Sequence, residues 1–221
     1  MAKRKDGIER KAQLLEAATK VFAEKGFRDT TISEICEEAK SNVASVNYYF
    51  GSKEDLYAEV WKTAHQKTLK RYPLDNGTGP DASSKECLRA FIRSLLHRML
   101  DSGQLGSAGK ILMMELTNPT EAIELVKRDS LEPIRKRMRG IMLELLGPDV
   151  PEQKKIFCVL STINQCFGLG LRKGSMPSPL KEMKRQDLLE ELTEHVTMFS
   201  LAGIEAVKKE SLINNGVGYA T

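Results

Sequence analysis

The stretch TTISEICEEAKSNVASVNYYFGSK, residues 30–53, decides the fold of the N-terminal part of this chain. Thr31, followed three residues later by Glu34, fits a capping box, in which each of the two side chains accepts a hydrogen bond from the backbone N–H of the other. A short helix is therefore predicted to begin here, and Lys40–Ser41 interrupts its apolar pattern. A second short helix is predicted over residues 42–50.

Longer helices flank these two short ones. Before them, apolar residues recur at spacings of four and three, which is one face of a helix. The members of this face are Ile8, Ala12, Leu15, Ala18 and Phe22. Gly26 is expected to end this helix as a left-handed cap, and Phe27 is expected to pack back on its last turn. A fourth helix is predicted to start at Ser52, with its inward residues at Leu56, Val60, Trp61 and Ala64.

Residues 31–50 therefore follow the helix-turn-helix plan, in which the second helix presents its N-terminal half to the major groove of DNA. Base edges are distinguishable in that groove: asparagine pairs with adenine, serine donates or accepts, and small apolar groups contact the thymine methyl. The expected base-reading residues are Asn42, Val43, Ala44, Ser45 and Asn47. The hydroxyls of Tyr48 and Tyr49 and the ammonium of Lys53 are suited to gripping phosphates.

Each of these residues also has an ordinary structural interpretation. Val43 shares a helical face with Val46, so it can belong to the core instead of the DNA-reading surface. Tyr49 can be a packing residue, and Lys53 can be a solvated surface charge. The net charge of residues 30–53 is −1, from two lysines against three glutamates, so the stretch is not a basic patch.

The remaining chain is predicted to be helical after a linker at residues 73–81 that is rich in Pro and Gly. The expected helical stretches are one around Leu88 to Met99, one over about 105–116, one from Asn118 to Leu146, and two over 152–172 and 186–208. Asn118 is the predicted N-cap of the third, which Pro133 should split or kink. The tail from Asn214 to Thr221 is expected to fray.

Residues 8–64 resemble the DNA-binding domain of the TetR family of bacterial repressors. The matching residues are Leu14, Leu15, Ala17, Ala18, Phe22, Gly26, Phe27, the segment TTISEI at 30–35 with Ala39, SVNYYF at 45–50 and SKEDL at 52–56. The resemblance implies an all-α protein with a helix-turn-helix domain over 1–62 and a larger helical-bundle domain over 63–221 that dimerises and binds an effector. It also implies that Thr31 joins Tyr48, Tyr49 and Lys53 as phosphate contacts.

The chain departs from the family pattern at the turn and in the second short helix. Lys40 stands where the family often has Gly, Ser41 where it often has an apolar residue, and Asn47 where it often has Tyr. Lys40 is tolerated only if the backbone there does not need a left-handed conformation. The substitution at position 47 suggests an operator sequence of its own.

The C-terminal part has a resemblance of its own, which is weaker. Residues 111–115, 118–120 and 164–166 resemble the effector domain of the CecR-type branch of the family, which is associated with the control of transport and drug-sensitivity genes. Eight of the nine methionines lie after residue 98. Methionine either lines an adaptable apolar cavity or fills gaps between helices. The amides at 164 and 165 interrupt an apolar helix and need partners, either across a dimer interface or on a ligand.

We therefore expect an apolar or amphipathic small molecule to bind between helices of residues 84–172. Its expected lining residues are Met113, Met114, Asn118, Asn164 and Gln165. Two apolar stripes are expected to pair with those of a second subunit in a symmetric homodimer. They are Phe157, Leu160, Ile163 and Phe167, and Leu188, Leu192, Val196, Phe199 and Ile204.

Composition narrows the class of protein. The 221 residues carry a net charge of +4, of which residues 1–11 supply an excess of +3, and 41% are apolar. The four cysteines form no C-x-x-C pair, and neither a secretory signal nor an apolar run of about 20 residues is found. The sequence predicts a cytoplasmic protein without metal, cofactor or membrane partner.

The predicted function is that of a ligand-responsive repressor that binds double-stranded DNA at a near-palindromic operator. An activator, or a DNA binder without an effector, is the alternative. A helical enzyme with an incidental helix-turn-helix is disfavoured because the chain has no Gly-rich phosphate loop, no His–carboxylate pair at ligand spacing and no nucleophile elbow, and so no catalytic residue is assigned.

Overall fold

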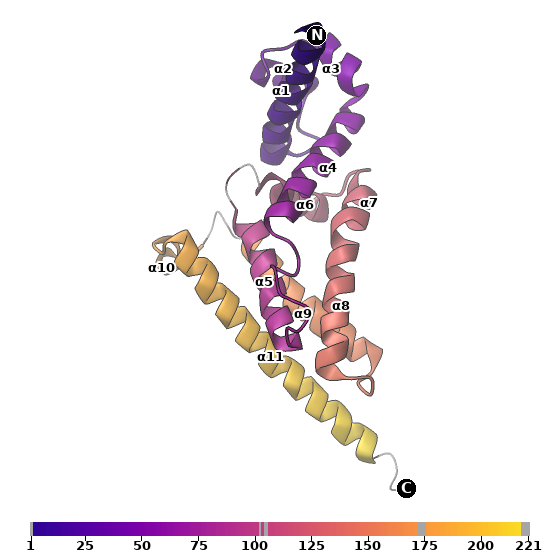
Figure 1. The fold of residues 1–221 in the computed structure, drawn as a ribbon, viewed down its shortest axis with the longest axis vertical. Helices are drawn as coiled ribbons and strands as arrows, with labels where there is room; N and C mark the ends of the chain where they lie inside the picture. The colour runs from indigo at the N-terminus through magenta and orange to yellow at the C-terminus, as the bar shows by residue number, and fades with distance from the viewer. Residues whose placement is uncertain (1, 102, 104–105, 172–175, 218–221) are drawn as a thin grey trace. The chain divides into compact units, whose positions relative to one another are not determined.

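The computed structural model describes residues 2–101, 103, 106–171 and 176–217, and all regular structure in these residues is helical (Figure 1). The chain forms two compact units. Unit 1 consists of Met1–Arg71 and Asp101–Ser130, and unit 2 consists of Tyr72–Leu100 and Leu131–Thr221. Both units are discontinuous in the sequence, whereas the two predicted domains are continuous. The predicted all-α fold class is confirmed.

Unit 1 is built on two long helices that cross shorter ones. Its helices are α1 (Ala2–Lys25), α2 (Ile32–Glu38), α3 (Val43–Phe50), α4 (Lys53–Arg71), α6 (Ser107–Thr117) and α7 (Ile123–Val126). Helix α1 packs on α2, α4 and α6, and α4 also packs on α3 and α6. The predicted left-handed cap at Gly26 is confirmed by its φ of 78°. The Phe27 ring stacks on Phe22 with centroids 6.3 Å apart, as expected.

Unit 2 is a bundle around α5. Its helices are α5 (Ser84–Leu100), α8 (Glu132–Leu146), α9 (Glu152–Leu171), α10 (Ser178–Lys181) and α11 (Arg185–Val217). Helix α5 packs against α8, α9 and α11, and its apolar stripe is fully buried at Leu88, Phe91, Ile92, Leu95 and Leu96. The amphipathic period that predicted these helices thus supplies the core of the bundle.

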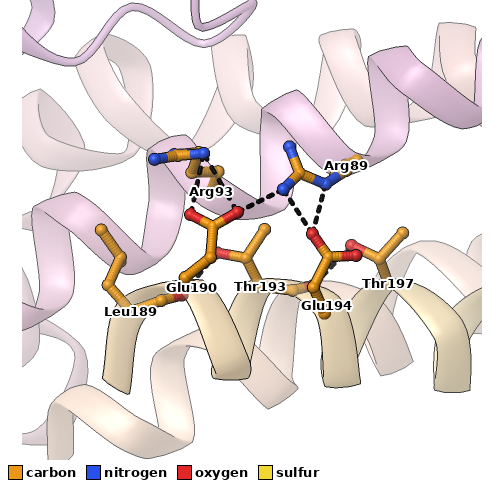
Figure 2. Close-up of polar contacts among 7 residues, drawn as sticks. All are labelled: Arg89, Arg93, Leu189, Glu190, Thr193, Glu194 and Thr197. Carbon is orange, nitrogen blue, oxygen red and sulfur yellow. Dashed lines mark hydrogen bonds and ion pairs between the residues drawn. The ribbon is translucent and has the colours of Figure 1, made fainter. Parts of the chain in front are cut away.

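A row of ion pairs fixes α11 along α5 (Figure 2). Arg89 Nε donates to Glu194 Oε1 at 2.6 Å and the Arg89 guanidinium also pairs with Glu190. Arg93 Nη1 lies 2.9 Å from Glu190 Oε2. The carboxylates raise the pKa of Arg89, and the hydrogen bond that Arg89 donates to Glu194 is the largest cause. These side chains are all partly exposed, so solvent screens their attraction.

Three boundaries differ from the prediction. Asn118 is not an N-cap: it follows the end of α6, and its N–H donates to the carbonyl of Met114. The predicted single helix after it is α7, a π-helical segment Lys127–Leu131 and α8, with Pro133 in the first turn of α8. The prediction that residues 214–217 fray is wrong because α11 includes them, and residues 218–221 lie outside the described part. No helix of the described residues is long and apolar enough to cross a membrane.

Candidate DNA-binding site

The first short helix begins with the predicted capping box. Glu34 N donates to Thr31 Oγ1 at 3.2 Å, and Thr31 N donates to Glu34 Oε2 at 2.8 Å. Glu34 also accepts a hydrogen bond from Lys25 Nζ at 2.5 Å, so α2 is tied to the end of α1. The bond from Lys25 and the two from Thr31 lower the pKa of Glu34 to about 2. The carboxylate therefore stays charged, and holds the start of α2, at every physiological pH.

The turn between α2 and α3 needs a left-handed residue, and Lys40 supplies it with a φ of 48°. Ser41 N donates to the carbonyl of Cys36 at 2.8 Å, which closes the turn. The sequence predicts that Lys40 is free of strain only if the backbone there is not left-handed, and the structure shows that it is left-handed. A residue with a Cβ loses about 1–2 kcal/mol in this conformation, whereas glycine does not.

Helix α3 begins at an N-cap that uses two of the predicted base-reading residues. Asn42 Oδ1 accepts from Ser45 N at 2.9 Å and from Ser45 Oγ at 3.0 Å. A carbonyl oxygen has two lone pairs, and both are engaged here. Bidentate pairing of Asn42 with adenine would need that same oxygen, so base reading and capping compete at this residue.

The outward face of α3 is formed by short side chains and one tyrosine. Val46 is fully buried against the rest of unit 1, whereas Val43 is 46% exposed and Tyr48 is 82% exposed. Asn42, Ala44 and Asn47 are exposed as well. Of the two interpretations of Val43, the exposed one holds, and a protruding phenol stands at the C-terminal half of the same face.

The other predicted phosphate contacts are partly engaged inside unit 1. The Tyr49 ring packs edge-on against Tyr48 at 4.9 Å, and its hydroxyl faces Gly7, where a Cβ would lie 3.6 Å away. Lys53 Nζ lies 4.4 Å from the centroid of the Phe27 ring, and Thr31 is exposed at the start of α2. The first turns of α1 therefore lie beside α3, and Lys53 is held over an aromatic face.

Sequence reasoning missed a buried hydrogen-bond network that joins α4 to α6 in unit 1. The Tyr57 hydroxyl on α4 donates to Glu115 Oε1 on α6 at 2.8 Å, and Glu115 is only 1% exposed. The same carboxylate accepts from Thr120 N at 3.0 Å and from Thr120 Oγ1. Burial and the neighbouring carboxylate raise the pKa of Tyr57. A glutamate among apolar residues of α6 was the available signal, since such residues are rarely buried unless paired.

The predicted effector residues are divided between the two units. Met113, Met114 and Asn118 belong to α6 and its end in unit 1, where Met114 Sδ lies 3.3 Å from the Cβ position of Gly26. Asn164 and Gln165 belong to α9 in unit 2, where Gln165 Nε2 donates to Ser200 Oγ on α11 at 3.3 Å. Neither unit by itself contains the complete set.

Comparisons with known proteins agree with this geometry. Residues 14–60 match the bacterial regulatory proteins of the tetR family, and residues 84–204 match the C-terminal domain of the HTH-type transcriptional dual regulator CecR. The CecR protein of Shigella flexneri is 28% identical over 178 residues, which cover 76% of this chain and 78% of that protein.

Solved structures of similar fold cover most of the chain. A putative transcriptional regulator from Pseudomonas aeruginosa PAO1 superposes with a TM-score of 0.63 at 21% identity, covering 90% of this chain and 94% of that one. A putative transcriptional regulator from Saccharomonospora viridis in complex with choline gives a TM-score of 0.61 at 18% identity, covering 86% and 95%.

Proposed function

Because the chain belongs to the TetR family of DNA-binding transcriptional regulators, in the group with a CecR-type C-terminal domain, we propose that it is a ligand-responsive repressor acting as a homodimer on a near-palindromic operator. The family and the relatives described above are regulators, not enzymes. The observation that carries the proposal is the outward face of α3, where Val43 and Tyr48 are exposed while Val46 anchors the helix.

In this proposal α3 enters the major groove and its N-terminal half reads bases. Val43, Ala44 and Asn47 contact base edges, with Asn47 the amide whose oxygen is not used by the cap. Asn42 and Ser45 first hold the start of α3 and contact DNA with the atoms left over. The DNA phosphates next to the groove are contacted by Thr31, Tyr48, Tyr49 and Lys53. These contacts fix the position of α3 in the groove but do not distinguish base sequences.

Dimerisation is proposed through α9 and α11, which carry most of the exposed apolar side chains of unit 2. Phe157 is 60% exposed and Leu160 is 42% exposed on α9, and Met198 and Phe199 are 65% and 62% exposed on α11. Asn164 is exposed one turn beyond Leu160, which favours an interfacial role for it over ligand contact. Of the other members of the predicted stripes, Leu192 is partly exposed, and the rest are buried within the subunit: Ile163, Phe167, Leu188, Val196 and Ile204.

We propose that the effector binds preferentially to an arrangement of the two subunits in which the two α3 helices cannot both contact the half-sites of the operator. Effector binding therefore weakens operator binding. Met113 and Met114 lie on α6, the helix that Glu115 joins to α4 of unit 1. A ligand that contacts these methionines would therefore act on α6, which packs on α1 and α4, and α4 in turn packs on α3. Control of transport or drug-sensitivity genes is the regulated process that the CecR-type domain suggests.

The test is selection of bound duplexes from random DNA, followed by titration of the selected operator at several salt concentrations. We expect a near-palindrome whose half-sites lie about one helical turn or more apart. Lys53→Ala should weaken binding to all sequences alike and reduce the salt slope by about 2 for the dimer. A protein that selects no DNA would defeat the proposal, and an unchanged slope would remove Lys53 from the phosphate contacts.

Activation in place of repression is the second candidate. The observation in its favour is that the Shigella flexneri relative is named a dual regulator. A reporter gene behind the selected operator distinguishes the two: expression should rise in cells that lack a repressor and fall in cells that lack an activator.

A further inference from the structure

Helix α5 carries a buried cation, Arg98, into the interior of unit 2. Arg98 is only 4% exposed. Its Nε and Nη2 donate to the carbonyl of Tyr72 at 3.0 and 2.6 Å, and the Ser94 hydroxyl donates to the same oxygen at 3.1 Å. Three donors therefore converge on one neutral acceptor, and the Tyr72 ring is held by stacking on His97 at 4.7 Å.

This arrangement leaves the charge of Arg98 without a counter-ion in the described part of the chain. Burial alone lowers the pKa of Arg98, to about 10, and no carboxylate acts against this shift. The guanidinium is thus still protonated at neutral pH. Charged groups are almost never buried without an ionic partner because their lost hydration must be replaced. Among the described residues of unit 2, no carboxylate is paired with Arg98.

The N–H groups of Arg98 that do not bond to Tyr72 form the free edge of the guanidinium, and this edge has the geometry to bind a negatively charged group. Arginine has five N–H donors in a rigid plane, and the Tyr72 carbonyl takes two of them. The remaining three have no acceptor among the described residues. A planar fork of this kind matches the two oxygens of a carboxylate and binds them side by side.

The surroundings of Arg98 on α5 are apolar. Leu95 and Phe91 lie three and seven residues before it, on the same face of the helix, and both are completely buried. Ser94, one turn before Arg98, is buried too and is already bonded to Tyr72. A molecule that reaches the guanidinium would therefore meet hydrocarbon over the rest of its surface.

We propose that Arg98 is the anchor of an effector site for an amphipathic organic carboxylate, whose anionic head pairs with the free edge of the guanidinium and whose apolar body lies along α5. This inference rests on the proposed function, because it names the chemical class of the effector and adds a residue that the sequence did not single out. The same charge should exclude cations such as choline, the ligand of the Saccharomonospora viridis relative.

The test compares acids with their neutral amides on the full-length protein. Butyrate, octanoate and phenylacetate are each titrated beside butyramide, octanamide and phenylacetamide, with choline as the cationic probe, and the melting temperature is followed. We expect at least one acid to raise the melting temperature, by about 5–10 °C at 100 times its dissociation constant. Its amide and choline should leave it unchanged.

Variants then assign the effect to Arg98. Arg98→Met should abolish the response to the acid. Arg98→Lys keeps the charge and the reach to Tyr72 but not the planar fork, so its affinity for the acid should fall about tenfold or more. The lysine variant keeps the test valid if the methionine variant does not fold. Arg89→Met, which removes an exposed arginine of the same helix, is the matched control and should respond like the wild type.

Several results would overturn the inference. They are the absence of a shift with all three acids, equal shifts with an acid and its amide, or a response that persists in Arg98→Met. Arg98 would then serve only to hold the carbonyl of Tyr72. Operator binding is measured in parallel: a wild-type protein that melts higher with an acid but binds no selected DNA contradicts the proposed function while leaving the carboxylate site standing.

Discussion

The two units of the molecule expose different kinds of surface. In unit 1 the large apolar side chains at the surface are few and scattered: Ile8, Val43, Tyr48 and Leu116. In unit 2 they are more numerous, and most lie on α9 and α11: Ile156, Phe157, Leu160, Met198, Phe199, Leu212 and Ile213, with Leu143 on α8. Unit 1 therefore leaves few large apolar side chains exposed, whereas unit 2 exposes the apolar side chains that we propose a second copy covers.

The units also differ in how they satisfy polar groups. Unit 1 buries the carboxylate of Glu115, which accepts hydrogen bonds from Tyr57 and Thr120. Unit 2 places its main ion pairs at the edge, between α5 and α11 (Figure 2). Buried networks tolerate little change because every member must stay bonded, whereas exposed pairs are screened by water. We therefore expect substitutions in the Glu115 network of unit 1 to destabilise the protein more than substitutions in the exposed ion pairs of unit 2.

The largest effect is expected from charges on the apolar face of unit 2. The double variant Phe157→Glu with Phe199→Glu should be a monomer by light scattering, because carboxylates would have to be buried at the interface. A monomer has only one helix-turn-helix, so its affinity for the operator should be at least about 100-fold weaker than that of the dimer. Leu143→Glu, at an exposed apolar position on α8, is the control and should remain a dimer. A dimeric double variant would place the interface elsewhere.

The next effect concerns the buried network of unit 1. Glu115→Ala leaves the donors of Tyr57 and Thr120 without their acceptor and should cost about 2–4 kcal/mol of unfolding free energy in urea. Tyr57→Phe removes only one of the bonds and should cost about 1–2 kcal/mol. Glu190→Ala in the exposed row of unit 2 should cost no more than about 1 kcal/mol. Equal losses for Glu115 and Glu190 would erase the contrast between the units.

A smaller effect separates the two roles of Asn42. Asn42→Ala removes the cap of α3 and should cost about 1 kcal/mol of stability. Asn42→Ser keeps a capping oxygen but removes the amide. If Asn42 also reads a base, the serine variant should keep its melting temperature and lose about 1–3 kcal/mol of preference at one operator position. Wild-type operator preference in the serine variant would restrict Asn42 to capping.

The smallest expected effect is a gain. Lys40→Gly removes the penalty of a left-handed residue with a Cβ and should stabilise the protein by about 0.5–1 kcal/mol, measured by urea unfolding. Lys40→Ala is the control, because alanine keeps the Cβ and should give no gain. Should the glycine variant be no more stable than the alanine variant, the turn does not strain Lys40.

Much of unit 1 could be predicted from the sequence because its signals are local. The capping box of Thr31 and Glu34, the cap at Gly26 and the short helix after Asn42 each depend on hydrogen bonds between residues three or four apart. Such bonds are encoded by the residues that make them. The long helices of unit 2 were predicted for a similar reason, since an amphipathic period marks them, whereas the short α10 was not predicted.

The local sequence pattern gave a wrong prediction at Asn118, where the signal for a helix start coincides with the end of another helix. Asn118 before a proline is typical of a helix start, yet the residue terminates α6, and its neighbour Pro119 accepts a hydrogen bond from Arg28 of the same unit. The conformation of Lys40 was likewise undecided by residue type alone. The closing bond from Ser41 to Cys36 requires a left-handed turn whatever side chain stands there.

The sequence by itself determined the all-helical class and the helix-turn-helix, because these follow from residue spacing. Only the tertiary structure decided that α6 belongs with the N-terminal helices, that Glu115 is bonded to Tyr57 and that Arg98 is buried with no ionic partner among the residues that the structure describes. Tyr57 and Glu115 lie 58 residues apart, and no periodic pattern relates such positions. Packing brings Tyr57 and Glu115 together, and burial strengthens the hydrogen bond between them and raises the cost of breaking it.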